Sequence, residues 1–274
     1  MTKIVTIARD TADSPNMVAN DAAILECITH ELRALGAEVT HTEQELLPAD
    51  TDIICHMSRT PGILQRLSKA EEEGVIVINS ADAVKNCSRL KMTQALADAD
   101  VPQPEFILIE SLDELDSLPY PAWIKRADGW SSHKEDVCYA AGSKEAKEIF
   151  TRMQNRGIVQ CIHFKHIKGD IIKFYAVGED YFHYSYPDPG KSKFGHELIN
   201  GAPHRYPFDI VQMRNIVTSA AKATGVEIFG GDCIVNERGE IYLIDLNDFP
   251  SFTAVRNEAA KEIARYIINK SKAR

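Results

Sequence analysis

The stretch IFGGDCIVNERGEIYLIDLN, residues 228–247, decides the fold. Two runs of apolar and β-branched residues flank the polar turn Asn236–Gly239, and this pattern is typical of a β-hairpin. Pairing Val235 with Glu240 across the turn places Gly230 opposite Asp245. Side chains alternate between the two faces of a strand, so the register decides which residues meet.

In this register three side chains that carry oxygen share one face of the hairpin: Asp232, Asp245 and Asn247. The two carboxylates are diagonal neighbours at roughly 7–8 Å and can reach one ion. Carboxylate and amide oxygens suit Mg²⁺, which completes its shell with water and phosphates. We therefore expect a magnesium site here, with Ile244 and Leu246 facing a core on the other side. A solvated hairpin face is the simpler alternative.

Basic residues stand in unusual places elsewhere in the chain. Lys125 ends the apolar run Pro-Ala-Trp-Ile-Lys, and Lys173 lies inside Asp-Ile-Ile-Lys-Phe-Tyr-Ala-Val. Arg89 and Lys91 lie on a helix that precedes a proline-rich break. A lysine in an apolar strand must extend its amine to solvent or meet an anion. Beside a magnesium site, the natural anion is phosphate.

The segment Arg126–Lys134 is the candidate phosphate loop. Its backbone amides and hydroxyls, including that of Ser132, can wrap a phosphate chain. The GxxxxGK[ST] motif of P-loop proteins is absent from the chain. His133 is a candidate contact for a transferred phosphate, although a lone loop histidine is more often simply solvated.

Residues 1–78 alternate strand-like and helical runs, which predicts a small parallel α/β unit. In its first helix Ser14 is the expected N-cap, Pro15 the first residue and Gly36 the terminator. The unit has no GxGxxG, so a dinucleotide-binding dehydrogenase is disfavoured. Further strands are expected at Ile4–Ala8, Glu38–Thr40, Asp52–His56, Val75–Ile78, Phe106–Ile109, Ala122–Lys125, Val137–Ala140, Val159–His163, Ile171–Val177 and Tyr181–Tyr186, and further helices at Pro61–Glu73, 80–100, Ser143–Gln154, Asp209–Thr224 and Ala254–Asn269.

Composition excludes several classes of function. The 274 residues carry 31 Lys and Arg against 40 Asp and Glu, a formal net charge of −9, which argues against a general nucleic-acid binder. No apolar run reaches the roughly 18–20 residues that cross a bilayer. Six cysteines without a CxxC pair, and an N-terminus unlike a signal peptide, favour a cytoplasmic location. No protein partner is predicted.

Together, these residues resemble the ATP-grasp superfamily across most of the chain. The resemblance implies a mixed α/β and α+β fold with an N-terminal Rossmann-like unit that precedes the ATP-grasp domain. It implies three domains: an N-terminal α/β domain at 1–86, a small ATP-grasp subdomain at 87–164, and a C-terminal subdomain with the metal site at 165–274. It also implies ATP and Mg²⁺ as cofactors.

Residue roles follow from the same resemblance. Lys125 and Lys173 would contact the ATP phosphates, assisted by Arg89, Lys91 and Ser132. Gln160 and the backbone of Cys161 and Ile162 would form the hinge that binds adenine. The magnesium ligands would be Asp232, Asp245 and Asn247.

Within that superfamily the chain is most similar to inositol 1,3,4-trisphosphate 5/6-kinases. Three stretches carry this similarity: Gly129-x-x-Ser132-His133, Lys173-x-x-x-Val177-Gly178-Glu179-x-Tyr181, and Phe229-Gly230-x-Asp232 with Ile244-Asp245-Leu246-Asn247-x-Phe249-Pro250. The chain departs from these kinases in three places. Arg9-Asp10-Thr11-Ala12-Asp13 replaces a lysine-rich segment, Tyr186 stands near an expected arginine, and Ser251 replaces a glycine.

The sequence is therefore compatible with three hypotheses for the function. The favoured one is phosphoryl transfer from ATP to a hydroxyl of a phosphorylated polyol, with Lys125, His133 and Lys173 acting on the phosphate. The alternative is a carboxylate–amine ligase that acts through an acyl phosphate, as in the glutathione-synthetase and ribosomal-protein-modifying branches, with Arg256 beside the acyl phosphate. A nucleotide-binding protein without turnover is the third. The acceptor is expected to be an anionic small molecule, and its candidate contacts are Arg59, Lys191, Lys193, His196 and Arg256.

Overall fold

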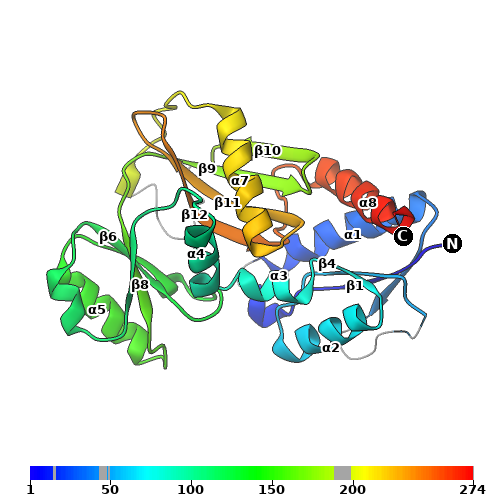
Figure 1. Cartoon of the computed structure of the whole chain (residues 1–274), viewed down its shortest axis with the longest axis horizontal. Helices are drawn as coiled ribbons and strands as arrows, with labels where there is room; N and C mark the ends of the chain where they lie inside the picture. Colours follow the sequence, from blue (N-terminus) through cyan, green and yellow to red (C-terminus); the bar gives the residue numbers. More distant parts are fainter. Residues whose placement is uncertain (15–16, 43–47, 49, 188–198, 274) are drawn as a thin grey trace.

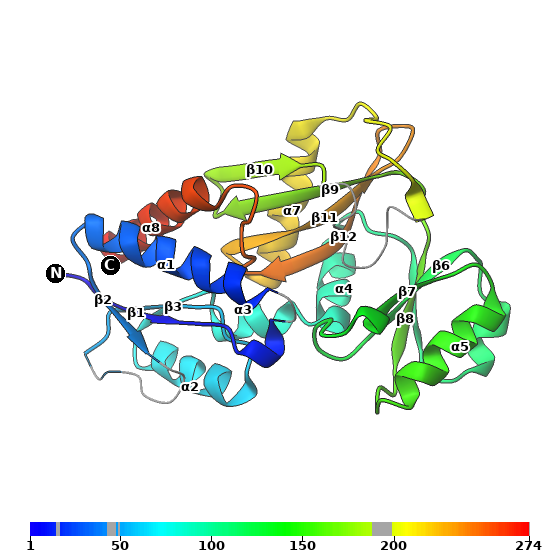
Figure 2. The same ribbon diagram turned by 180° about the vertical axis from the view of Figure 1, so that it is seen from behind.

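The computed structural model describes residues 1–14, 17–42, 48, 50–187 and 199–273. Three four-stranded sheets organise them. Figures 1 and 2 show the N-terminal sheet and the β5–β8 sheet at opposite ends of the molecule, with the β9–β12 sheet between them. In the described residues, no helix is both long and apolar enough to cross a membrane.

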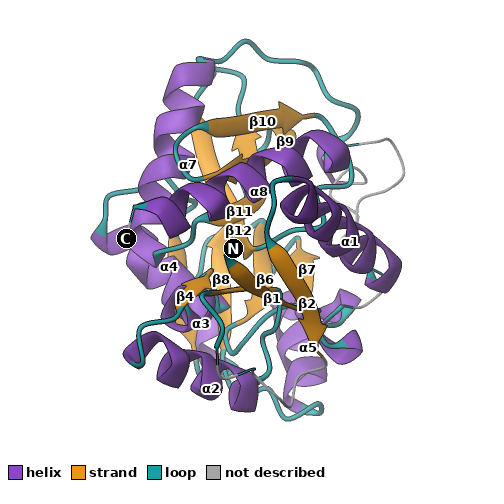
Figure 3. Ribbon diagram, turned by 90° about the vertical axis from the view of Figure 1, so that its right-hand side faces the viewer, coloured by secondary structure: helices purple, strands orange, loops and turns teal. Residues whose placement is uncertain are grey.

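The N-terminal sheet is parallel, with strand order β2-β1-β3-β4. Its strands are β1 (Lys3–Ile7), β2 (Glu38–Thr42), β3 (Ile53–His56) and β4 (Ile76–Ile78). Helices cover both faces, as Figure 3 shows from one side of the molecule. Buried side chains of α1 (Val18–Ala34) and α8 (Arg256–Lys272) pack on one face, and those of α2 (Pro61–Glu72) and α3 (Ala81–Asn86) pack on the other.

Two predictions about helix boundaries are wrong. Met17, not Ser14, is the N-cap of α1; the Ser14 hydroxyl instead donates to Asp21 Oδ2 at 2.6 Å. Pro15 lies outside the described residues. The helix predicted over 80–100 is two helices, because the chain turns at Cys87 and restarts at the N-cap Ser88 as α4 (Arg89–Asp98).

The β5–β8 sheet is antiparallel, with order β5-β8-β6-β7. It comprises β5 (Phe106–Ile109), β6 (Ala122–Arg126), β7 (Val137–Ala140) and β8 (Cys161–Lys165). Helix α5 (Ser143–Gln154) covers one face. Strand β8 begins two residues later than predicted, after Val159, whose exposed fraction is 72%. The face away from α5 carries Trp123, Ile162 and Phe164.

The β9–β12 sheet is also antiparallel, with order β10-β9-β11-β12. It comprises β9 (Asp170–Val177), β10 (Tyr181–Ser185), β11 (Ile228–Val235) and β12 (Ile241–Asp248). Side chains of α7 (Ile210–Thr224) and α4 share one apolar cluster with this sheet. Helix α4 thus packs partly against the C-terminal region, although the sequence predicts that it belongs to the small subdomain at 87–164. The three domain boundaries stay a prediction.

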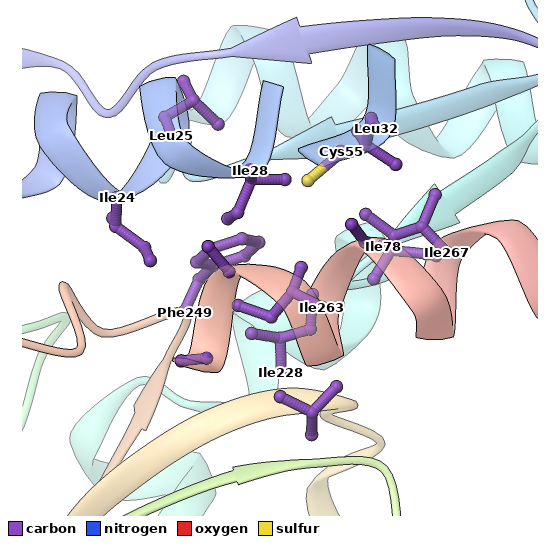
Figure 4. Close-up of a cluster of buried hydrophobic side chains, with 14 of the residues drawn as sticks. Ile24, Leu25, Ile28, Leu32, Cys55, Ile78, Ile228, Phe249, Ile263 and Ile267 are labelled. Carbon is purple, nitrogen blue, oxygen red and sulfur yellow. The ribbon is translucent and has the colours of Figure 1, made fainter. Parts of the chain in front are cut away.

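One apolar cluster joins the first and last parts of the chain. It contains Ile24 and Ile28 of α1, Ile228 of β11, and Ile263 and Ile267 of α8, all fully buried (Figure 4). Asn79, which follows β4, adds three hydrogen bonds to the same junction. Its Oδ1 accepts the N–H groups of Glu227 and Ile228, each at 2.8 Å, and its Nδ2 donates to the Ile228 carbonyl at 2.8 Å.

The β11–β12 hairpin exists, but its predicted register is wrong. Val235 pairs with Ile241 rather than Glu240, and a β-bulge then inserts Ile244, so that Asp232 lies directly opposite Asp245. The bulge interrupts the alternation of side chains. Leu243 and Leu246 are both buried in the core, at 1% and 2% exposure, whereas Ile244 does not belong to that cluster. The prediction that Ile244 faces the core is therefore also wrong.

Candidate functional site

Three charged residues lie side by side across the β9–β12 sheet. Lys173 of β9 pairs in register with Asp232 of β11, which pairs with Asp245 of β12. We call Lys173, Asp232 and Asp245 the charged row. Lys173 Nζ lies 2.8 Å from Asp232 Oδ1. That carboxylate raises the pKa of Lys173, more than burial lowers it, so the lysine stays charged.

Asp245 is held by two further residues of the site. Arg89, at the start of α4, donates from Nη1 to Asp245 Oδ1 at 2.8 Å, and Asn247 donates from Nδ2 to Asp245 Oδ2 at 2.9 Å. Burial alone would raise the pKa of Asp245, but Arg89 and Lys125 outweigh it and lower the pKa to about 2. The carboxylate is therefore ionised at any physiological pH.

Lys125 reaches the same strand from the opposite sheet. Its Nζ donates to the carbonyl of the bulge residue Ile244 at 3.0 Å and lies 4.7 Å from the ring centre of Phe164. The residue is only 6% exposed. Burial, and then the nearby Arg89, lower the pKa of Lys125 to about 7. A buried amine with such a pKa gains its proton readily when an anion arrives.

Two arginines of the N-terminal unit, whose side chains are largely buried, meet the end of β12; the sequence names Arg59 as a candidate acceptor contact but predicts neither of these contacts. Arg9, after β1, donates to the Phe249 carbonyl at 2.7 Å and lies 3.7 Å from Asp248 Oδ2. Arg59, after β3, donates from Nε to Asp248 Oδ1 at 2.8 Å. Asp248 is 1% exposed. The available signal was position, since both arginines follow the carboxyl end of a parallel strand, where sites form.

This chain resembles known proteins in its structure. Neither a scan of protein-family models nor a search of curated proteins gives a match. Solved structures do match. D-alanine–D-alanine ligase from Bacillus anthracis has a TM-score of 0.73 and 14% identity, covering 100% of this chain and 98% of that one; its complex with ATP has a TM-score of 0.71, 13% identity and the same coverage. A RimK domain ATP-grasp protein from Sphaerobacter thermophilus has a TM-score of 0.69 and 12% identity over 97% of this chain and 100% of that one.

A third neighbour is the ATP-grasp ligase PsnB in complex with a minimal precursor, with a TM-score of 0.65, 15% identity, and coverage of 98% of this chain and 99% of that one. The chain has the ATP-grasp fold. The N-terminal parallel unit precedes the two ATP-grasp sheets, as the sequence predicts. The similarity to inositol 1,3,4-trisphosphate 5/6-kinases is not shown by these comparisons.

In this ATP-grasp fold, a buried carboxylate shapes the loop after β6, and the phosphate contacts of this loop stay a prediction. Asp136, fully buried, accepts the backbone N–H groups of Ser132 and His133 at 2.9 and 2.7 Å, and Arg156 at 2.6 Å. Burial would raise the pKa of Asp136, but the His133 N–H, Arg156 and Arg126 lower it below its usual value. His133 is exposed, and its Nδ1 accepts the N–H of Glu135 at 3.2 Å. It caps a short 3₁₀-helix and lies outside the charged row. Ser131, not Ser132, meets Arg89, at 3.1 Å.

The residues of the predicted adenine hinge pair with neighbouring strands, and their role stays a prediction. Cys161 and Ile162 lie in β8, the second strand of its sheet, with partners on both sides: Arg126 and Lys125 of β6, and Ile109 and Leu108 of β5. The Gln160 carbonyl accepts the Ala127 N–H at 3.2 Å. Gln160 Nε2 donates to Glu110 Oε1 at 2.6 Å. The backbone of these residues is therefore engaged within the sheet.

The remaining predicted residues lie apart from the charged row. Lys91 is exposed on α4 and lines a cavity together with Arg59 and Trp130. Arg256, the first residue of α8, donates to Asn20 of α1 at 2.8 Å. Lys191, Lys193 and His196 lie outside the described residues.

The two ATP-grasp sheets approach closely beside Lys125. A cavity of about 10 Å³ lies at this point, lined by Trp123 and Phe164 from one sheet and Ile234 and Ile244 from the other. That volume holds about one water molecule. A planar base would enter only if the two sheets moved apart.

The donor set at the charged row fits a magnesium ion. The side chains of Asp232 and Asp245 are 25% and 24% exposed, and the Asn247 amide nitrogen bonds Asp245, which leaves the amide oxygen for a ligand. The described residues contain no group of three His, Cys, Asp or Glu arranged for a metal. Two carboxylates and an amide oxygen suit Mg²⁺ when water and phosphate complete the shell.

Proposed function

We propose that this protein is an ATP-dependent ligase that joins a carboxylate to an amine. The observation that carries the proposal is the charged row, in which Lys173, Asp232 and Asp245 lie beside Arg89 and Lys125. Cations for phosphates and oxygen donors for Mg²⁺ thus meet at one face. The fold neighbours support a ligase by their names, and one of them binds ATP.

The proposed reaction has two steps. A carboxylate oxygen of the acceptor attacks the γ-phosphorus of ATP, the bond to the β–γ bridging oxygen breaks, and ADP leaves. The amine then attacks the acyl carbon, phosphate leaves, and the amine loses a proton. Lys125 and Lys173 offset the charge that develops on the transferred phosphoryl group, because fixed charges in a partly buried site act strongly.

Arg89 positions Asp245 and holds it ionised, so that Asp232, Asp245 and Asn247 can bind Mg²⁺. When bound, the ion would neutralise part of the negative charge of the nucleotide phosphates. Asn247 keeps Asp245 in place through its amide hydrogen bond. Proton uptake by Lys125 would accompany nucleotide binding, because phosphate oxygens stabilise the charged amine.

Transfer to the hydroxyl of a phosphorylated polyol is the second candidate, and only the cationic cavity beside Lys91 favours it. The position of His133 does not support the kinase, because its side chain lies outside the charged row and accepts the Glu135 N–H. The test measures ADP and free phosphate in parallel with Mg-ATP over amino acids, short peptides, sugar phosphates and inositol phosphates. Equal ADP and phosphate, dependent on both an acid and an amine, support the ligase. ADP without free phosphate supports the kinase and overturns the ligase.

Asp245→Asn should abolish turnover, because it removes one of the two carboxylates while keeping the shape of the side chain. The measurement is the rate of ADP release, with circular dichroism to confirm that the fold survives. Asp180→Asn on the exposed turn between β9 and β10 is the matched control and should retain the full rate. Normal turnover by Asp245→Asn would contradict the metal assignment.

A further inference from the structure

A larger cavity lies outside the charged row. It has a volume of about 490 Å³ and opens between α2, the junction of α3 and α4, and the loop after β6. Small-molecule sites have volumes of roughly 300–1,000 Å³. Its lining includes Arg59, Ser68, Lys85, Lys91 and Trp130. The size therefore suits a compact metabolite.

All charged residues in the lining of the cavity are basic, and one of them, Arg59, is already paired with Asp248. Arg59, Lys85 and Lys91 line it, and none of the lining residues is acidic, although the chain has a net charge of −9. Lys91 forms no ion pair with any described residue. Lys85 Nζ lies 2.9 Å from the exposed carboxylate of Asp82, a kind of surface pair that contributes little. The amines of Lys85 and Lys91 thus remain for a ligand, and together they favour one with two negative charges.

Trp130 provides an unsatisfied donor at the same place. Its indole nitrogen is buried and has no hydrogen-bond partner in the described part of the chain. The Arg59 guanidinium lies 5.1 Å from the centre of the ring and holds it in place. Buried donors are normally satisfied, so this nitrogen needs an acceptor that the described residues do not supply, while the side chain of Trp130 lines the cavity. Pro61 and Leu64 supply an apolar wall beside it.

The cavity adjoins the charged row through three lining residues. Ser88 precedes Arg89, which bonds Asp245; Trp130 precedes Ser131, which accepts from Arg89 at 3.1 Å. Arg59 itself bonds Asp248, the neighbour of Asn247 on β12. A molecule in the cavity would therefore lie next to the residues proposed to hold the phosphates.

We infer that this cavity binds the acceptor substrate, a small molecule with at least two anionic groups and a compact apolar part against Leu64 and Trp130. The assignment as acceptor site rests on the proposed ligase function. Carboxylate and phosphate groups satisfy the same cations, so the shared chemistry is a multiply charged oxyanion. Lys91 and Lys85 are the specificity-determining residues of the cavity.

Trp130 is itself the reporter for the test. The protein is titrated at constant ionic strength, and its tryptophan fluorescence is measured. The probes are citrate, which carries carboxylates, and fructose 1,6-bisphosphate, which carries phosphates. Fructose is the neutral control. We expect a saturable change with at least one anion and none with fructose. Trp130→Phe should remove the change while Trp123 still emits. The anion that binds more tightly identifies the preferred group.

Variants separate the cavity from general charge effects. Lys91→Ala and Lys85→Ala should each weaken binding of the better probe about tenfold, as expected for a lost charged hydrogen bond. Lys69→Ala changes an exposed lysine of α2 that pairs with Glu73 outside the cavity, and it should bind the probe as wild type does. No saturable change with either anion, or equal weakening by all three variants, would overturn the inference.

Nucleotide binding by the wild type is measured separately, by calorimetry with Mg-ADP. If Mg-ADP binds but neither anion does, the cavity assignment fails and the proposed ligase survives. If an anion binds through Lys91 and Lys85 but Mg-ADP does not, the proposed ligase fails, and with it the role of the cavity as an acceptor site.

Discussion

At the scale of single residues, Lys125 has the most unusual environment in the site. Its amine is buried between the two ATP-grasp sheets, where it donates to the Ile244 carbonyl and lies over the Phe164 ring. Burying a charged amine costs free energy, which is why its pKa falls to about 7. Wild-type stability should therefore depend on pH through this one side chain.

Lys125→Met should flatten that dependence. Between pH 7 and about 10 the unfolded chain holds a proton on Lys125 that the folded chain does not, so the free energy of unfolding rises with pH in this window. The rise due to Lys125 is about 1.4 kcal/mol per pH unit, and it is absent below pH 7, where both states are protonated. Urea unfolding at pH 7, 8 and 9 measures it. Parallel curves for wild type and Lys125→Met would contradict the buried, neutral lysine.

At this scale, the sequence names residues that the structure brings together where a helix or a strand fixes the side chains; their roles stay predictions. Arg89, Lys125, Lys173 and Asp245 come together because each lies on or beside a regular element. The sequence does not place His133, because the loop is shaped by the buried Asp136, whose donors come from the loop backbone and from Arg156 at the end of α5. Local sequence does not encode such a long-range anchor.

At the scale of elements, the β11–β12 hairpin carries the site. Its existence and its polar face follow from the alternating sequence, but its register does not. Five residues rather than four separate the paired Val235 and Ile241, and Ile244 adds the bulge. Neither shift changes the local pattern of apolar residues, so only packing against the core, through Leu243 and Leu246, selects the observed register.

Gly231→Ala should test how tightly this hairpin is built. A Cβ at Gly231 would overlap the Asp245 carbonyl oxygen and crowd Phe174, which lies in the core. Relief requires the strand to shift, so we expect a loss of about 3 kcal/mol in the free energy of unfolding. Gly142→Ala is the control, because a Cβ there meets nothing within 4 Å, and it should change stability little. Equal stability of both variants in urea would show that the hairpin can relax.

At the scale of the whole molecule, the order of the three sheets follows from the order of the sequence patterns, but their docking does not. The N-terminal unit is joined to the β9–β12 sheet by α8 and by Asn79. Both contacts unite residues that are more than a hundred positions apart. No periodicity or spacing encodes them, because they depend on how complete elements fit together.

Asn79→Ala should loosen this junction. The change leaves the buried N–H groups of Glu227 and Ile228 without their acceptor, so the free energy of unfolding should fall by about 3 kcal/mol. Asn86→Ala loses one bond of 3.2 Å, to the Thr224 carbonyl, and should cost about 1 kcal/mol. Urea unfolding compares the two. A smaller loss for Asn79→Ala than for Asn86→Ala would contradict its role at the junction.

The position of α8 also constrains how the protein is made. Helix α1 leaves the ribosome early, yet the apolar face that it shares with Ile263 and Ile267 has no cover until more than two hundred further residues have been translated. At the usual elongation rates of roughly 5–20 residues per second, that interval is tens of seconds or less. During this interval the nascent chain exposes the apolar face of α1. A chaperone that binds apolar surfaces would therefore bind this protein at its first helix.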